Sequence, residues 1–105
     1  MSEAPIGLNI VAEGDQERSF QLIGDVDLHT VGQLDDLLRE LGTGADATLD
    51  LGGVTFMDSF GLRTVLANHE LLNSHGHTLW LFHLSPAVRR LLEITHVIDE
   101  LAVRH

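Results

Sequence analysis

At 105 residues with 44% apolar side chains, the chain is long enough for one domain with its own core. It has no cysteine, which excludes thiolate catalysis, disulfides and cysteine-bound zinc and fits a reducing compartment. Sixteen acidic residues against six arginines give a net charge of −10, which disfavours nucleic acid and anionic lipid as partners. No apolar run approaches the roughly 20 residues of a membrane span, so we expect a cytoplasmic protein without membrane contact.

Two alternating segments near the start of the chain predict a β-hairpin. Apolar and polar side chains alternate over residues 8–12 and again over residues 20–24. Residues 14–17, with the sequence Gly-Asp-Gln-Glu, supply the turn. We expect residues 1–6 to be a flexible N-terminus and residues 7–105 to form the domain.

The next segment has the spacing of an amphipathic helix. Its apolar side chains share one face, and they are Val31, Leu34, Leu38 and Leu41. Thr30 and Gln33 have the pattern of a capping box, and Gly42-Thr43-Gly44 ends the helix. The apolar run over residues 47–51, bounded by a pair of glycines, then predicts a short buried strand.

The second half of the chain alternates helices with strands. A helix is predicted up to Asn73, and residues 78–84 form an apolar strand. Ser85 followed by Pro86 is typical of a helix start. The apolar faces of these two helices are Leu62, Val65, Leu66 and Leu72 in the first, and Val88, Leu91 and Leu92 in the second. Residues 97–103 have no decisive period and form either a final short strand or a turn.

This order of elements predicts an α/β domain. Strands joined through helices usually run parallel, by right-handed crossovers, so the later half of the sheet should be parallel and the hairpin antiparallel. We therefore expect a mixed, mostly parallel sheet of four to five strands with about three helices packed on it.

Two strand-to-helix junctions carry aspartate. Functional groups of α/β sheets gather at the carboxyl ends of strands, where helix amino-termini present free N–H groups. One junction contains Asp25 and Asp27, and the other contains Asp58 and Ser59. Either residue of the second pair would also serve as an ordinary helix cap, and the first pair as solvated turn residues. The residue types alone leave both interpretations open.

Two motifs resemble the STAS domain of bacterial anti-sigma factor antagonists. The first is the turn Gly-Asp-Val-Asp at residues 24–27, and the second is Asp-Leu-Gly-Gly-Val-Thr-Phe-Met-Asp-Ser-Phe-Gly-Leu at residues 50–62. They occur in the family's order, and the similarity spans nearly the whole chain. The resemblance implies a STAS-like single domain. Many members have a further C-terminal helix, which we expect to be missing or shortened here.

The resemblance also implies a phosphorylation switch at Ser59. In the family, a hydroxyl beside the strand-end aspartate is phosphorylated by a partner that is both a serine kinase and an anti-sigma factor. The unmodified antagonist sequesters that partner and frees a sigma factor, whereas phosphorylation releases the partner and a phosphatase restores binding. Asp58, Asp27 and Asp25 match the acidic residues near the family's phosphorylation site.

A phosphate on Ser59 would add about −1.5 to −2 charges beside Asp58. We expect the free N–H groups of the helix to bind its oxygens, so that the fold tolerates the modification. An interface built against a neutral hydroxyl would suffer from the added charge and bulk. The prediction is therefore dissociation of the partner and not unfolding.

Phe60 occupies the position where many members of the family have a second serine or threonine. It leaves Ser59 as the one hydroxyl in the segment Asp-Ser-Phe-Gly at residues 58–61. Phe60 and Arg63 lie in the first helical turn, off the apolar stripe, and we predict that they contact the kinase together with Gly61. The alternative is an ordinary half-exposed first turn.

Catalysis and metal binding are not expected. The chain has no Walker-type phosphate loop, no nucleophile elbow and no HExxH arrangement. His69, His75 and His77 are close in sequence but fall on a helix end, a turn and a strand start, so we predict neither a metal site nor a cofactor. The functional alternatives are a non-switching STAS subunit of a transport or stress-sensing assembly, and a small-ligand (nucleotide) binding STAS domain.

Overall fold

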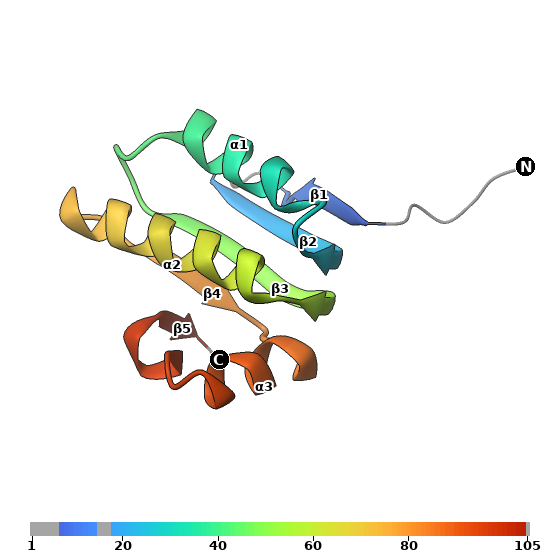
Figure 1. The fold of residues 1–105 in the computed structure, drawn as a ribbon. Coiled ribbons are helices and arrows are strands. Elements are labelled where there is room, and N and C mark those ends of the chain that lie inside the picture. The colour runs from blue at the N-terminus through green and yellow to red at the C-terminus, as the bar shows by residue number, and fades with distance from the viewer. Residues whose placement is uncertain (1–6, 15–17, 105) are drawn as a thin grey trace, which may run out of the picture.

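Strands and helices alternate along the chain in a computed structural model that describes residues 7–14 and 18–104 (Figure 1). Within these residues the strands are β1 (Leu8–Ala12), β2 (Ser19–Val26), β3 (Ala47–Met57), β4 (Leu79–Phe82) and β5 (Ala102–Arg104). The helices are α1 (Val31–Leu41), α2 (Ser59–Ser74) and α3 (Pro86–Ile94), followed by the 3-10 turn Ile98–Glu100. The predicted flexible segment 1–6 and most of the predicted hairpin turn lie outside the described residues.

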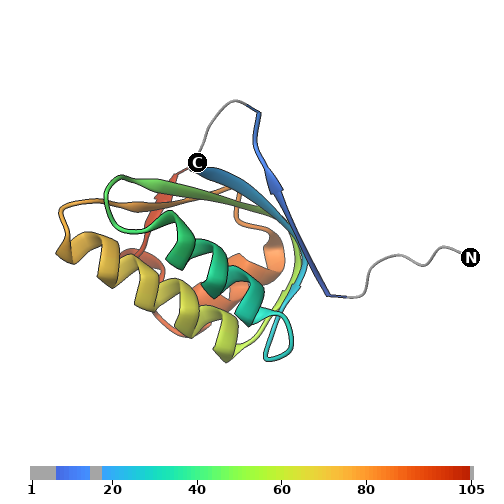
Figure 2. The same cartoon turned by 90° about the horizontal axis from the view of Figure 1, so that it is seen from above.

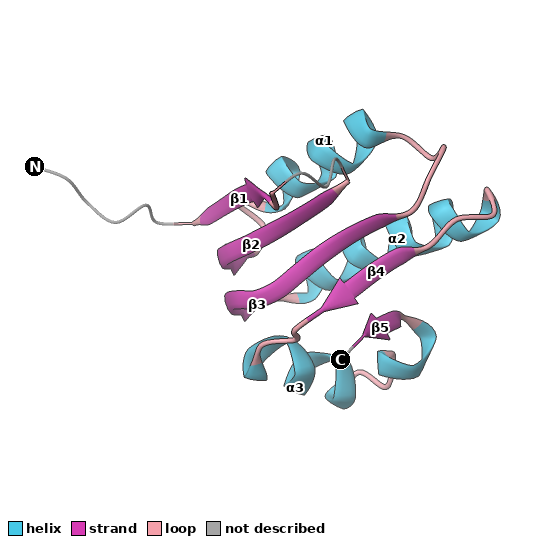
Figure 3. Ribbon diagram, turned by 180° about the vertical axis from the view of Figure 1, so that it is seen from behind, coloured by secondary structure: helices cyan, strands magenta, loops and turns pink. Residues whose placement is uncertain are grey.

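The strands form one sheet in the order β1-β2-β3-β4-β5. β1 pairs with β2 antiparallel, and every later pair is parallel, which confirms the predicted mixed, mostly parallel sheet. Residues 97–103, for which two structures were possible, contain the 3-10 turn and the start of β5. All three helices cover one face of the sheet (Figure 2), and the view from behind shows the strands with no helix in front of them (Figure 3).

The core lies between the sheet and its helical layer. Inward-facing side chains of the strands are fully buried, and they include Leu22, Leu49, Leu51, Leu79 and Leu81. The predicted stripe of α2 is confirmed, because Leu62, Val65 and Leu72 are buried and Leu66 packs against the core. Burying one such side chain contributes about 2 kcal/mol. This packing fixes α2 on the sheet and therefore sets where its first turn lies.

β3 is longer than the predicted strand 47–51, and the predicted end point was wrong. The strand continues through Gly52 and Gly53 to Met57. Its register with β2 shifts twice, between Gln21 and Ile23 of β2 and again between Gly24 and Asp25, so that β3 gains one residue each time. Glycines tolerate such bulges, which bend a strand without ending it. The second bulge turns Thr55 and Phe56 outward while Met57 stays buried.

β4 is shorter than the predicted strand 78–84. It ends at Phe82, and His83 has a positive φ of 54°, which an extended strand cannot accommodate. The predicted start of α3 is confirmed. Ser85 precedes Pro86, and its hydroxyl accepts a hydrogen bond from the Val88 N–H at 3.2 Å.

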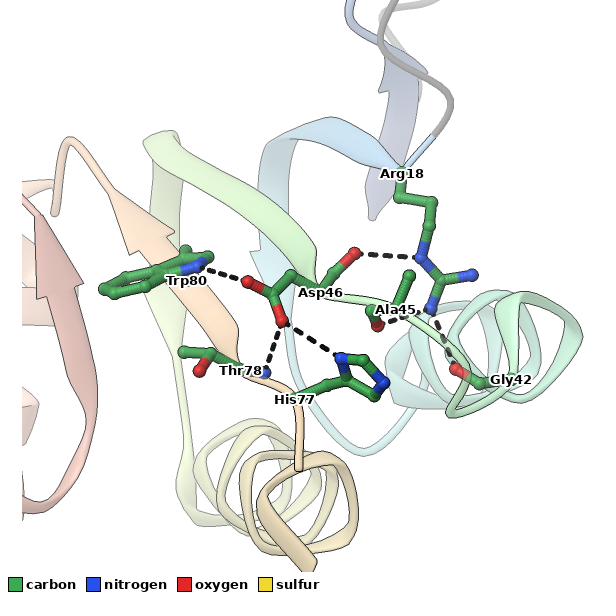
Figure 4. A network of polar contacts seen from close by, with 7 residues as sticks. All are labelled: Arg18, Gly42, Ala45, Asp46, His77, Thr78 and Trp80. Atoms are coloured by element: carbon green, nitrogen blue, oxygen red, sulfur yellow. Dashed lines mark hydrogen bonds and ion pairs between the residues drawn. The ribbon is translucent and has the colours of Figure 1, made fainter. Parts of the chain in front are cut away.

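A cluster of polar contacts closes the end of the sheet that lies away from the start of α2 (Figure 4). Arg18 donates to the carbonyl oxygens of Gly42, Ala45 and Asp46 at 2.9, 3.0 and 2.8 Å, and also to that of Leu41. These carbonyls belong to the end of α1 and the loop after it, so a single guanidinium joins β2 to the α1–β3 connection.

The Asp46 carboxylate is the second centre of the same cluster. It accepts hydrogen bonds from the Thr78 N–H at 2.9 Å and from the Trp80 indole N–H at 3.2 Å, and His77 Nδ1 lies 3.5 Å away. The Thr78 and Trp80 hydrogen bonds lower the pKa of Asp46, because they favour its ionised form.

Candidate functional site

The two acidic junctions predicted from the sequence lie side by side at the carboxyl ends of β2 and β3 (Figure 1). The strands are parallel neighbours, with Val26 paired with Met57. The Asp58 N–H donates to the Val26 carbonyl at 3.2 Å, which ties the start of α2 to the end of β2. Within the described residues, no hydrogen bond joins Asp25 or Asp27 to Asp58 or Ser59, so the backbone carries the connection.

Asp58 is the cap of α2. Its backbone is extended, with φ −106° and ψ −172°, and its Oδ1 accepts from the N–H groups of Phe60 and Gly61 at 2.9 and 3.1 Å. Its carbonyl accepts from the Leu62 N–H at 3.0 Å. The capping interpretation of the sequence therefore holds for Asp58, and Ser59 is free of that role.

Ser59 is the first residue of α2 and is exposed. Its hydroxyl has no hydrogen-bond partner among the residues that the structure describes. The expectation that free N–H groups of the helix would bind a phosphate here stays a prediction, and in the unmodified protein the Asp58 carboxylate accepts from two of these groups, those of Phe60 and Gly61. A phosphate oxygen on Ser59 would lie beside N–H groups that already donate to Asp58, and beside the negative charge of the Asp58 carboxylate.

The acidic turn is held together by Thr30. The Thr30 hydroxyl donates to the Asp25 carbonyl at 2.8 Å and accepts from the Asp27 N–H at 3.0 Å. The Asp27 carboxylate accepts from the N–H groups of His29 and Thr30 at 2.9 and 3.2 Å. The predicted capping box with Gln33 is therefore wrong: the Thr30 side chain makes no bond to the helix and binds the preceding turn instead.

Asp25 has a partner that the sequence did not indicate. The Thr55 hydroxyl donates to Asp25 Oδ1 at 2.9 Å across the β2–β3 pair. The contact depends on the second bulge of β3, which turns Thr55 outward and pairs Asp25 with Phe56. The only signal in the sequence was the polar threonine within an otherwise apolar run.

Phe60 and Arg63 lie on the surface beside Ser59, as predicted. The Phe60 side chain is 39% exposed, and the Arg63 guanidinium carbon lies 5.5 Å from the centre of its ring. This distance is within the range of a cation–π contact. The first turn of α2 thus presents a hydroxyl, an aromatic ring and a guanidinium together.

Gly61, predicted with these two residues, is buried. A Cβ at this position would lie 2.6 Å from the Val26 carbonyl oxygen and 2.9 Å from Met57 Cγ. Gly61 faces the strand ends and not solvent. It therefore allows α2 to approach β2 closely and presents no exposed surface to a partner.

Two exposed apolar residues at the junctions were not predicted. Leu28, in the loop after the acidic turn, is 56% exposed, and Phe56, near the end of β3, is 50% exposed. In the sequence, Leu28 is a single apolar residue among polar ones, and this isolation is the signal that could have indicated an exposed side chain. Together with Phe60 they are exposed apolar side chains at the two junctions.

Metal-ligand clusters and membrane-spanning helices are absent from residues 7–14 and 18–104. No three His, Asp or Glu side chains come together there in a way that would hold a metal ion, and no helix is long and apolar enough to cross a bilayer. Of His69, His75 and His77, only His69 has a ring nitrogen, Nδ1, that is buried without a hydrogen-bond partner in this part of the chain.

Comparison with known proteins places the chain in a family. The STAS domain family matches residues 9–105. The anti-sigma-B factor antagonist of Staphylococcus epidermidis is 33% identical over 79 residues, which are 72% of this chain and 72% of that protein. The chain therefore belongs to the STAS domain family, among the anti-sigma factor antagonists.

Solved structures agree on the fold. The anti-sigma factor antagonist from Mycobacterium paratuberculosis has a TM-score of 0.80 and 22% identity, over 97% of this chain and 89% of that one. The phosphorylated form of SpoIIAA, a Bacillus cell fate determinant, has a TM-score of 0.66 and 18% identity, over 93% and 91%. The STAS-like α/β fold predicted from the sequence is confirmed.

Proposed function

We propose that the chain is a phosphorylation-switched antagonist of an anti-sigma factor. The unmodified protein binds an anti-sigma factor that is also a serine kinase, and in doing so frees a sigma factor for transcription. The observation that carries this proposal is the Ser59 hydroxyl, which is exposed and unpartnered among the described residues, directly after the capping Asp58. The Staphylococcus epidermidis relative, an anti-sigma-B factor antagonist, supports the choice of partner.

The binding surface is the first turn of α2 with the loop and strand end beside it. Phe60 and Arg63 supply an aromatic ring and a guanidinium, which are side chains enriched at interface hot spots. Leu28, after β2, and Phe56, near the end of β3, add exposed apolar area at the two junctions. The partner covers this surface, and the Ser59 hydroxyl lies within it.

Phosphorylation of Ser59 ends this binding through charge. The phosphate would lie next to Asp58, near the acidic turn with Asp25 and Asp27, and inside an interface that fits a neutral hydroxyl. A phosphatase removes the group and restores the antagonist. The protein acts in the cytoplasm by binding alone, with no catalytic residues or cofactor of its own.

The test is a kinase reaction with a matched control. Wild-type protein, Ser59→Ala and Ser74→Ala are each incubated with the purified anti-sigma kinase and ATP, and the products are mapped by mass spectrometry. Ser74 is a suitable control because it is exposed at the other end of α2 and its hydroxyl is bound to the Leu71 carbonyl. We expect one phosphate in the wild type and in Ser74→Ala, and none in Ser59→Ala.

A wild-type protein that binds the anti-sigma factor but gains no phosphate at Ser59 would contradict the switch. That result would instead support the non-switching STAS subunit. Heat released on titration with nucleotides, without any binding to the anti-sigma factor, would favour the small-ligand alternative.

A further inference from the structure

We propose that Arg63 receives the phosphate of Ser59, and that it does so by leaving the ring of Phe60. The inference rests on the proposed modification of Ser59 and adds how the modified state is read. In the unmodified state Arg63 lies over Phe60, and in the phosphorylated state it pairs with the phosphate and uncovers the ring.

The first reason is that the helix N-terminus has few donors left. The N–H groups of Phe60 and Gly61 point to the Asp58 carboxylate at 2.9 and 3.1 Å, and that of Leu62 to the Asp58 carbonyl at 3.0 Å. Of the first four N–H groups of α2, only that of Ser59 has no hydrogen-bond partner among the described residues, and a cationic side chain would offset the repulsion between the phosphate and Asp58.

The second reason is position. Arg63 follows Ser59 by four residues on α2, and side chains with this spacing are neighbours on a helix surface, with Cβ atoms about 5–6 Å apart. Arg63 is also the only arginine or lysine in α2. It is exposed, and no ion pair holds it within the described part of the chain, whereas Arg39 on α1 is paired with Asp35 at 3.0 Å.

The third reason is the contact that Arg63 makes now. Its guanidinium carbon lies 5.5 Å from the centre of the Phe60 ring, which is a weak interaction at an exposed site. A bidentate, charge-assisted pair with a phosphate is stronger, so the guanidinium should exchange one partner for the other. Phosphorylation would then change the exposure of the Phe60 ring as well as the charge of the surface around Ser59.

The test uses protein that carries phosphoserine at position 59 by genetic encoding, so no kinase is required. The pH midpoint of the ³¹P chemical shift is measured in the wild type, Arg63→Gln, Arg63→Lys and Arg39→Gln. A nearby guanidinium favours the dianion, so the wild-type midpoint should lie below that of Arg63→Gln by about 0.3 pH units. Arg39→Gln should match the wild type, and Arg63→Lys should fall between.

A second measurement follows the ring. In unmodified protein the nuclear Overhauser contacts between Arg63 and Phe60 should be present, and in phosphoserine protein they should be lost. Equal ³¹P midpoints in the wild type and Arg63→Gln, or contacts unchanged by the phosphate, would overturn the proposal. Because neither measurement involves a kinase or an anti-sigma factor, failure of the proposed function would show only in the kinase reaction and in partner binding.

Discussion

Asp58 and Ser59 are adjacent residues with different roles. The Asp58 carboxylate is committed to the backbone of α2, while the Ser59 side chain is left exposed at the edge of the same turn. A cap that uses aspartate therefore fixes the helix start without consuming the hydroxyl. Asp27 and Thr30 make a second closed set of bonds in the neighbouring turn, so both junctions are ordered before a partner arrives.

Gly61 sets the distance between α2 and β2. In Gly61→Ala the added Cβ would meet the Val26 carbonyl oxygen at 2.6 Å and Val26 Cγ1 at 2.8 Å, so either the helix or the strand end must move. We expect the free energy of unfolding to fall by about 2 kcal/mol in urea denaturation.

Gly32 is the matched control for this substitution. It lies in α1, with no atom within 4 Å of an added Cβ. Gly32→Ala should raise the free energy of unfolding by about 0.5 kcal/mol, because alanine favours the helix and restricts the unfolded chain. Equal effects of the two substitutions would mean that the close approach at Gly61 does not limit the packing.

At the level of elements, Arg18 links β2 to the end of α1 and to the loop that follows. Arg18→Ala would leave four carbonyl oxygens without their donor, and we expect a loss of about 2 kcal/mol in the free energy of unfolding. Arg18→Lys should recover only part of it, because an ammonium cannot reproduce the guanidinium fork. Full recovery with lysine would show that the charge matters and the geometry does not.

Asp46 makes stability depend on pH at the same end of the sheet. Its pKa is lower in the folded protein than in the unfolded chain, so its contribution is present above the unfolded pKa and is lost as pH falls through the folded one. In urea denaturation between pH 6 and pH 2, Asp46→Asn should lose less stability than the wild type. A parallel loss in both proteins would argue against this role.

Much of the secondary structure could be predicted from the sequence, and two of the failures share a cause. Helix spacing identified α1, α2 and α3, and serine before Pro86 marked the start of the third helix. The end of β3 was missed because glycines mark both turns and bulges, and only pairing with β2 distinguishes them. The bond between Asp25 and Thr55 was missed for the same reason, since it exists only across that pairing.

For the whole molecule, the arrangement separates stability from recognition. The helical layer and the Arg18–Asp46 cluster hold the fold, while the proposed binding surface lies at the other end of β2 and β3, on side chains that the core does not need (Figure 1). A net charge of −10 adds a long-range preference for a basic partner surface.

Phe60 should therefore matter for binding and little for folding. Phe60→Ala removes a half-exposed ring, and we expect the affinity for the anti-sigma factor to fall about tenfold or more while the melting temperature changes little. Leu71→Ala is the control, because Leu71 is similarly exposed on α2 but lies toward its other end. A large loss of stability with unchanged affinity would remove Phe60 from the interface.

The most direct test of the central claim is the affinity of the purified anti-sigma factor for the unmodified protein and for protein carrying phosphoserine at position 59, measured by calorimetry. We predict tight binding of the unmodified protein and of Ser59→Ala, and binding at least about 100-fold weaker, or about 2.7 kcal/mol, for the phosphorylated form. The melting temperatures of all three should be similar. Equal affinity of the modified and unmodified proteins would contradict the account.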